Sequence, residues 1–177
     1  MPKTTAHLLA KVHGMMSSGE VDLLHQCAEK LPLEPICVNI GAGFGTSALA
    51  ILEKKPGAFI FSVDTREQKA EKQNVQKAGF SAWQVVRVLG NSGYVGIHWP
   101  YDDIDLLFVD GAHDNASVTR DIQAWVPKVT KGGVILFHDY KHRNLPDLTG
   151  IVDRAMRDYQ YIGENRYLVA FQKLLKE

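Results

Sequence analysis

The sequence contains little cysteine, and its two cysteines form no motif of a disulfide framework or a zinc site. Cys27 and Cys37 are the only two among 177 residues, and they make neither a Cys-x-x-Cys pair nor a zinc-ligand spacing. We therefore expect two buried free thiols in a reducing compartment, which favours a cytoplasmic protein.

Net charge and long apolar runs are also absent. Lys plus Arg number 20 and Asp plus Glu number 20, so the formal net charge is zero. The chain therefore lacks the excess of positive charge that is typical of proteins that bind nucleic acid or an acidic membrane surface. No apolar stretch approaches the length of a transmembrane helix, and residues 1–16 lack the apolar core of a signal peptide. We therefore expect neither nucleic acid nor a membrane as a partner.

Internal repeats, linkers and low-complexity segments are lacking, and the length suits one domain with a sizeable core. We predict a single domain over residues 1–177, with an N-terminal helical segment (1–31) and a core (32–177). Within the helical segment, Ser17 and Glu20 have the spacing of a capping box. His13, Met15 and Met16 come just before this capping box. Their side chains either pack in the protein core or lie over a bound ligand.

Glycine, by contrast, is concentrated where an apolar run turns into a helical pattern. Residues 36–40 predict a buried parallel strand, Gly41, Gly43 and Gly45 follow, and residues 48–54 predict a helix. Glycine permits a sharp turn and a close approach of ligand to backbone, and the helix start offers free N–H groups. A nucleotide-like or carboxylate ligand suits such a turn, as does a tight turn without a ligand. A dinucleotide-binding fingerprint would have its third glycine at position 46. This chain has Thr46 there, and its third glycine comes one residue earlier.

Further apolar runs predict strands that each deliver polar residues to one edge of a sheet. The runs cover residues 58–63, 82–89, 106–109 and 134–137, with helical patterns over 66–77, 118–126 and 147–159. Ligands bind at the carboxyl ends of parallel strands in open α/β sheets. The polar residues that follow the runs are Asp64, Asn91, Ser92, Asp110, His113, His138 and Asp139.

Residues 159–172 predict two further strands around a turn at Gly163-Glu164-Asn165. Trp99, Tyr101 and Tyr140 are open to two interpretations, the lining of a substrate pocket or ordinary packing.

Taken in order, Asn39–Gly45, Val63-Asp64, Phe108–His113 and Gly132–Tyr140 resemble the motifs of class I S-adenosylmethionine-dependent methyltransferases. More narrowly, the chain resembles small-molecule O-methyltransferases of the macrolide-sugar and cephalosporin-biosynthesis type. The resemblance implies a Rossmann-like, doubly wound α/β fold. Its seven-stranded, mostly parallel sheet would have the order 3-2-1-4-5-7-6, with the last strand antiparallel and helices on both faces.

The resemblance also implies a function: transfer of a methyl group from S-adenosylmethionine to a hydroxyl of a small molecule, assisted by a divalent cation such as Mg²⁺ or Mn²⁺. His113 corresponds to a general base. The implied metal ligands are Asp110, His138 and Asp139. The implied cofactor-binding residues are Asn39, Gly41, Ala42, Gly43, Gly45, Ser47, Asp64, Asn91, Ser92 and Asp110.

Two positions depart from the pattern of that family. Asn39 stands where an acid is usual before the glycine turn, which removes a charge near the cationic end of the cofactor. His138 stands where the metal-dependent members have a carboxylate. Magnesium prefers oxygen ligands, whereas an imidazole favours manganese, iron, nickel or zinc.

Three other functions compete with this interpretation. A nicotinamide oxidoreductase has the same succession of strand, glycine turn and helix, but its third glycine would stand at position 46, where this chain has Thr46. A nucleic-acid methyltransferase would usually carry an Asp/Asn-Pro-Pro-aromatic tetrad where this chain has Asp110-Gly111-Ala112-His113. A non-catalytic relative would bind the cofactor, or nothing, and act as a scaffold. The short chain has little insertion to cover a substrate, so a homo-oligomer could complete the acceptor pocket.

Overall fold

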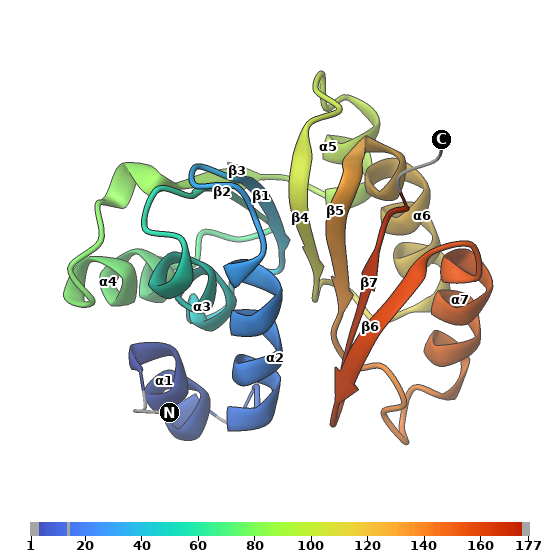
Figure 1. Cartoon of the computed structure of the whole chain (residues 1–177), viewed down its shortest axis with the longest axis horizontal. Coiled ribbons are helices and arrows are strands. Elements are labelled where there is room, and N and C mark those ends of the chain that lie inside the picture. Colours follow the sequence, from blue (N-terminus) through green and yellow to red (C-terminus); the bar gives the residue numbers. More distant parts are fainter. Residues whose placement is uncertain (1–3, 14, 175–177) are drawn as a thin grey trace.

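The computed structural model describes residues 4–13 and 15–174. Its centre is a seven-stranded sheet of order β3-β2-β1-β4-β5-β7-β6, which is the predicted order (Figure 1). Strands β1 to β5 are parallel, and β7 is antiparallel to both β5 and β6. The strands are β1 (Ile36–Ile40), β2 (Phe59–Asp64), β3 (Val85–Leu89), β4 (Ile104–Val109), β5 (Val129–Phe137), β6 (Gln160–Asn165) and β7 (Leu168–Gln172).

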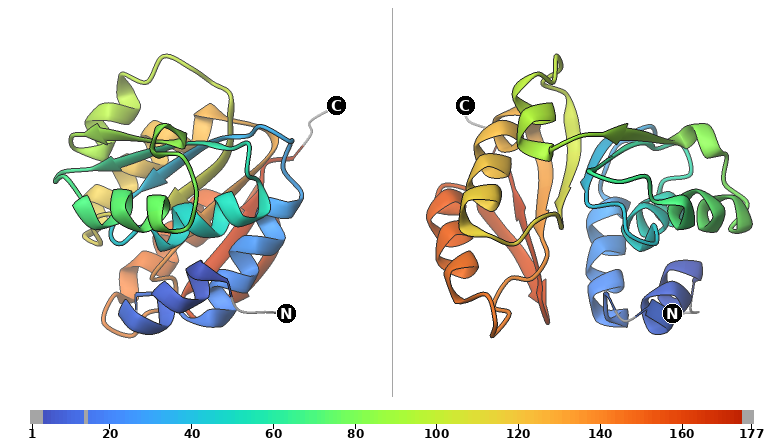
Figure 2. Two further views of the ribbon diagram at one scale, coloured as in Figure 1. Left: turned by 90° about the vertical axis from the view of Figure 1, so that its left-hand side faces the viewer. Right: turned by 180° about the vertical axis from the view of Figure 1, so that it is seen from behind.

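Helices cover both faces of the sheet, as the two further views show (Figure 2). One face carries α1 (Thr5–His13), α2 (Ser18–Glu29), α3 (Thr46–Lys54) and α4 (Lys69–Lys77). The other carries α5 (Ser92–Ile97), α6 (Asn115–Trp125) and α7 (Pro146–Met156). Among the described residues, no helix is long and apolar enough to cross a membrane.

The central strands are mostly apolar, as expected for strands that are covered on both faces. Successive residues of β1 enter opposite cores: Cys37 joins the core under α2 and α3, and Val38 joins the core under α6 and α7. Strand β4 alternates in the same way, with Leu106 in the first core and Leu107 in the second. Cys27 and Cys37 are buried free thiols, as predicted.

The capping box at the start of α2 is confirmed. The backbone N–H of Glu20 donates to Ser17 Oγ (3.3 Å), and the N–H of Ser17 donates to the Glu20 carboxylate. The same carboxylate also accepts the N–H of Tyr167 at 2.9 Å. Glu20 therefore joins the N-terminal helical segment to the β6–β7 hairpin.

Several boundaries differ from the prediction, and three of them have a local reason. Residues 82–84 form a 3₁₀ turn instead of the start of a strand, because Gln84 caps Ser81 and donates to Pro56 O. Helix α4 begins at Lys69 and not at residue 66, because the Asp64 carboxylate accepts the N–H of Arg66 and holds a bend there.

The hairpin turn lies at Arg166-Tyr167 and not at residues 163–165. Strand β6 continues through Gly163, where the register with β7 shifts, and Arg166 takes the positive φ of 49° that the turn requires. Strand β5 also begins earlier than predicted, at Val129, and α5 has no counterpart in the prediction.

Candidate functional site

The glycine turn after β1 is pressed against the end of β4. Gly41 has a φ of +88°, and a Cβ atom there would lie 2.0 Å from the carbonyl oxygen of Asp110. Hydrogen bonds fix this approach: the N–H of Gly41 donates to Val63 O, and the N–H of Asp110 donates to Ile40 O, each at 2.9 Å. Only glycine fits this position, because both the φ angle and the space exclude a side chain.

Asp64 stands at the end of β2 and holds the glycine turn from the other side. Its Oδ2 accepts the N–H of Ala42 at 3.1 Å and the side chain of Gln68 at 3.3 Å, while Oδ1 accepts the N–H of Arg66 at 2.9 Å. The carboxylate is half-buried, so it remains open to a ligand. A carboxylate can accept two further hydroxyl protons at once.

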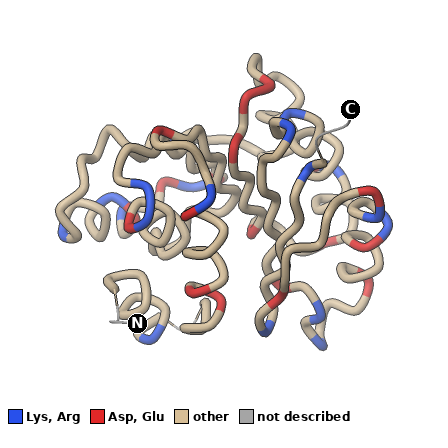
Figure 3. The backbone as a smooth tube through the Cα atoms, viewed as in Figure 1, with Lys and Arg blue, Asp and Glu red and all other residues tan. Residues whose placement is uncertain are grey.

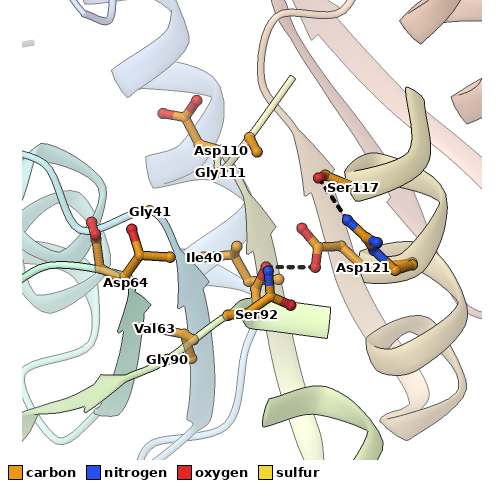
Figure 4. A pocket seen from close by; sticks show the side chains of 14 residues that line it. Ile40, Gly41, Val63, Asp64, Gly90, Ser92, Asp110, Gly111, Ser117 and Asp121 are labelled. Carbon is orange, nitrogen blue, oxygen red and sulfur yellow. Dashed lines mark hydrogen bonds between the residues drawn. The ribbon is translucent and has the colours of Figure 1, made fainter. Parts of the chain in front are cut away.

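Two cavities adjoin at this edge of the sheet and share Gly41, Asp64, Asp110 and Gly111. The first has a volume of about 310 Å³ and extends towards α5 and α6. Figure 4 shows Asp64 and Asp110 on one side of it and Ser92 and Asp121 on the other. The second, of about 250 Å³, lies over the glycine turn. Together they form one elongated site along the carboxyl ends of β1, β2 and β4.

Most of the predicted cofactor residues line this site. Those in one or both cavities are Gly41, Ala42, Gly43, Ser47, Asp64, Asn91, Ser92 and Asp110, and His113 lines the second cavity. Asn39 and Gly45 line neither. Asn39 is fully buried beneath the turn, and Gly45 is the N-cap of α3 with a φ of +81°.

Asn91 and Ser92 begin helix α5. The Asn91 side-chain oxygen accepts the N–H of Tyr94 at 3.1 Å, and Ser92 Oγ donates to Asp121 Oδ1 at 2.6 Å. Burial raises the pKa of Asp121, whose Oδ2 has no hydrogen-bond partner among the described residues. The sequence analysis did not single out Asp121. Asp121 lies three residues after Val118 and four before Trp125, on the apolar face of α6. This spacing is the sequence signal that could have predicted its burial.

A buried polar network supports the glycine turn from below. Ser47 Oγ donates to Asn39 Oδ1 (2.9 Å), and Asn39 Nδ2 donates to Gly41 O and to Ser62 Oγ (3.2 Å each). Ser62 Oγ then donates to Glu71 Oε1 at 2.6 Å. Glu71 was not predicted either, because a single acid in a charged helix carries little signal.

Glu71 is fully buried, and its second carboxylate oxygen has no partner among the described residues. Burial raises its pKa to about 7, against the opposing effects of the Ser62 hydrogen bond and the charge of Arg87.

The predicted metal ligands do lie together, at the ends of β4 and β5. His138 Nδ1 is 3.3 Å from Asp110 Oδ1 and 3.4 Å from Asp139 Oδ2, and His138 Nε2 is 3.5 Å from Glu20 Oε1. Burial opposes the charged form of His138, but these three carboxylates outweigh it and raise the pKa to about 12.

The charge state of His138 decides whether this group suits a metal ion. An imidazolium has no lone pair to offer a metal, so His138 would have to release its proton before it could join the two aspartates as a ligand. The ligand atoms of the three side chains lie within 4.8 Å of one another. Metal ligation by this group stays a prediction from resemblance.

His113 lies at the mouth of the second cavity. Its Nδ1 is 3.4 Å from Asp139 Oδ2, and 44% of its side chain is exposed. Asp139 has a φ of 58°, an uncommon value for a residue with a side chain, which aims its carboxylate between His113 and His138. A histidine held by a carboxylate and open to a cavity can accept a proton there.

The N-terminal segment reaches the second cavity. Met15 and Met16 line it, and the His13 ring stacks on Phe44 of the glycine turn with ring centroids 3.5 Å apart. Trp99, Tyr101 and Tyr140, which the sequence left open as pocket or packing residues, are not among the residues that line the two cavities. Trp99 packs between Phe61 and Trp125, Tyr101 is exposed, and Tyr140 donates to Asp153 at 2.8 Å.

Residues 38–140 match a family model described as a methyltransferase domain. This range contains the last three residues of β1, all of β2 to β5, and every residue that lines the first cavity. An uncharacterized protein of Acanthamoeba polyphaga mimivirus is 38% identical over 58 residues, which are 32% of this chain and 26% of that protein. The chain therefore spans about a quarter of the length of this relative.

Solved structures share the fold at low sequence identity. A protein of Corynebacterium glutamicum is 18% identical with a TM-score of 0.78, covering 97% of this chain and 89% of its own. The MycE methyltransferase of mycinamycin biosynthesis was solved with Mg, SAH and mycinamycin VI. It is 15% identical with a TM-score of 0.65, and the match covers 97% of this chain and 55% of the MycE chain. An rRNA methylase of Streptococcus thermophilus is also 15% identical, with a TM-score of 0.66, covering 89% and 95%.

Proposed function

The chain belongs to the methyltransferase domain family, and on that premise we propose that it transfers a methyl group from S-adenosylmethionine to a hydroxyl of a small molecule. The observation that supports this most is the elongated site in which the glycine turn, Asp64 and Asp110 face one another at the carboxyl edge of the sheet. A nucleotide with an amino-acid tail needs a site of that length and polarity.

The residues of the site suit the parts of this cofactor. The glycine turn, with Ser47 behind it, would hold the methionine part over bare backbone and the start of α3. Asp64 would accept the ribose hydroxyl protons, and the first cavity beside Asn91 and Ser92 would take the adenine. Gly41 and Gly43 line the cavities without side chains, so the cofactor could approach their backbone closely.

S-adenosylmethionine supplies a methyl group on a sulfonium, which needs little activation, so the protein must align the acceptor and remove its proton. His113 is placed to accept that proton at the mouth of the second cavity. Asp139 would hold the ring and stabilise the imidazolium that forms. A positioned base of this kind contributes about 10²–10⁴-fold to the rate. This proposal routes no step through a divalent cation.

We further propose a small-molecule acceptor in preference to nucleic acid, and a cytoplasmic location. Positive and negative side chains are interspersed along the backbone, which suits a neutral acceptor better than a polyanion (Figure 3). Met15 lines the second cavity and is half-exposed, so a second copy of the chain could complete the acceptor pocket there.

Isothermal titration with S-adenosylmethionine tests the cofactor, and formation of S-adenosylhomocysteine over a panel of sugar and phenol acceptors tests turnover. We expect His113→Ala to lose turnover by at least about 100-fold and to keep cofactor affinity. The matched control is His98→Ala, which removes an exposed histidine from the end of α5. Absence of any binding heat would remove the cofactor from the proposal, and full turnover in His113→Ala would remove the base.

Retained cofactor binding with no turnover across the panel would instead favour a non-catalytic relative that uses the same site. Measurable reduction of a nicotinamide cofactor would favour the oxidoreductase.

A further inference from the structure

A second group of metal-ligating side chains lies where α1, α2 and α3 meet, away from the site described above (Figure 1). It contains His7 from α1, and Asp22 and His25 from α2, with Glu53 from α3 beside them. Asp22 and His25 are three residues apart and so share one face of their helix. Each of the three residues offers a ligand atom, and these atoms all lie within 4.8 Å of one another.

The contacts within this group are those of a nearly assembled metal site. His7 Nε2 is 3.0 Å from Asp22 Oδ1, and the two imidazole rings meet edge to face at 5.4 Å. Two ligands of a tetrahedral zinc ion lie about 3.4 Å apart when each bond is about 2.05 Å. His7 Nε2 and Asp22 Oδ1 are at hydrogen-bond distance, about 0.4 Å closer than two such ligands. The ligand atom of His25 lies within 4.8 Å of both, so it would have to approach each of them by about 1.4 Å at most.

Each histidine also has an outer partner of the kind that orients metal ligands. His25 Nε2 is 3.0 Å from Glu53 Oε2, and His7 Nδ1 is 3.0 Å from Thr4 Oγ1, a hydroxyl oxygen that can accept the Nδ1 proton. A carboxylate behind a histidine fixes the ring and strengthens it as a ligand.

Burial and access differ across the group in the way a metal site needs. His7 and His25 are 6% and 3% exposed, whereas 47% of the Asp22 side chain is exposed. Two buried imidazoles on one side and a half-exposed carboxylate on the other leave a path for an ion and room for water as a fourth ligand.

We propose that His7, Asp22 and His25 bind a zinc-like divalent cation, with Glu53 as the outer partner of His25. The donor set of two imidazoles and one carboxylate suits zinc and cobalt better than magnesium or calcium, which prefer oxygen ligands. The site is independent of the methyl-transfer proposal, because none of these residues lines the elongated site.

The consequence of metal binding would be structural. The ion would tie α1 to α2, and through Glu53 to α3, by bonds rather than by packing alone. Helix α1 ends at His13, which stacks on Phe44 of the glycine turn. A metal at the start of α1 would therefore hold in place the helix whose other end covers that turn.

Cobalt titration of the chelator-treated full chain tests the proposal, because Co²⁺ with four ligands gives visible absorption bands that Zn²⁺ then abolishes. Asp22→Asn removes the charged ligand oxygen and keeps the size of a half-exposed side chain, and His25→Phe keeps a ring in the buried position. We expect both to lose the cobalt bands, and Glu53→Gln to weaken binding about 10–100-fold.

Matched controls separate this site from other sources of binding. Asp158→Asn removes an exposed aspartate, and His98→Phe changes an exposed histidine, so both should keep the bands. Asp139→Asn removes a ligand from the other His–Asp group and should keep them as well. Zn²⁺ at a hundredfold excess over its Kd should raise the Tm of the unmodified chain by about 5–10 °C, and slow amide exchange in α1.

Three results would overturn the proposal. These are no cobalt bands in the unmodified chain, bands retained in Asp22→Asn, or bands lost in Asp139→Asn, which would assign the ion to the edge of the sheet. If His25→Phe does not fold, Asp22→Asn decides the question, because its position tolerates a polar side chain of the same size.

Discussion

Replacement of Glu71 by glutamine should change how the stability of the protein depends on pH. Glu71 is fully buried on α4, accepts the Ser62 hydroxyl at 2.6 Å, and has a second oxygen without a partner among the described residues. Glutamine has the same shape and can still accept the Ser62 proton, but it cannot ionise. The substitution therefore removes one titration and preserves the packing beneath the glycine turn.

The magnitude follows from the raised pKa. The carboxyl has a pKa of about 7 in the folded state and an ordinary value of 4.5 in the unfolded chain. Below pH 4.5 the Glu71 carboxyl is protonated in both the folded and the unfolded state, so it does not lower the free energy of unfolding. Between pH 4.5 and 7 the unfolded state loses its proton first, so stability falls by up to about 1.4 kcal/mol per pH unit. Above pH 7 the full penalty, about 3 kcal/mol, is present.

Urea unfolding of both proteins at pH values from 5 to 9 measures this effect. The glutamine variant should be close to the parent at pH 5 and more stable than it at pH 8–9, by about 2–3 kcal/mol. Exposed Glu67 supplies the control, since Glu67→Gln removes the same charge nearby and should leave the pH dependence unchanged. A difference between Glu71→Gln and the parent that is constant with pH would refute a raised pKa at this position.

Three further substitutions probe the glycine turn and the network beneath it. Gly41→Ala should lose more than about 3 kcal/mol in urea unfolding, because its Cβ would lie 2.0 Å from Asp110 O. Gly79→Ala, with a φ of 89° and nothing within 4 Å, should lose only about 1–2 kcal/mol. Asp64→Asn should weaken S-adenosylmethionine binding at least about 10-fold by titration calorimetry, and unchanged affinity would remove the ribose role. Asn39→Asp should destabilise by about 2–4 kcal/mol at pH 8, since it loses two donated hydrogen bonds and adds a buried charge. Adding Glu71→Gln should restore part of that loss in the same unfolding assay.

Strand positions were predictable because parallel strands that are covered on both faces are rich in apolar residues. β1, β2 and β4 stand out from their surroundings for that reason. The order of the strands came from the resemblance and not from the apolar pattern. Helix α5 escaped prediction because Ser92–Ile97 contains two glycines and too few turns to show a period.

The candidate site was predictable where a residue follows a strand and unpredictable where a helix turns a residue inward. Asp64 and Asp110 reach the cavities because the chain ends a strand there. Glu71 and Asp121 lie on helices among other charged residues, and only the packing of each helix determines which acid is buried. The approach of Glu20 to His138 likewise depends on how α2 meets the hairpin, which no local pattern encodes.

The two departures from the methyltransferase pattern gain a physical explanation from these distant acids. Asn39 lacks a charge, and Glu71 stands one hydroxyl away through Ser62, so an acid from α4 occupies the region beneath the turn. His138 adds a charge, and Glu20 faces it across the ring from Asp110 and Asp139. A carboxylate at position 138 would instead place three acids together against Glu20, and such a group would have to share protons or bind a cation. With histidine there, a side chain that can carry a positive charge stands among these acids in place of a fourth carboxyl group.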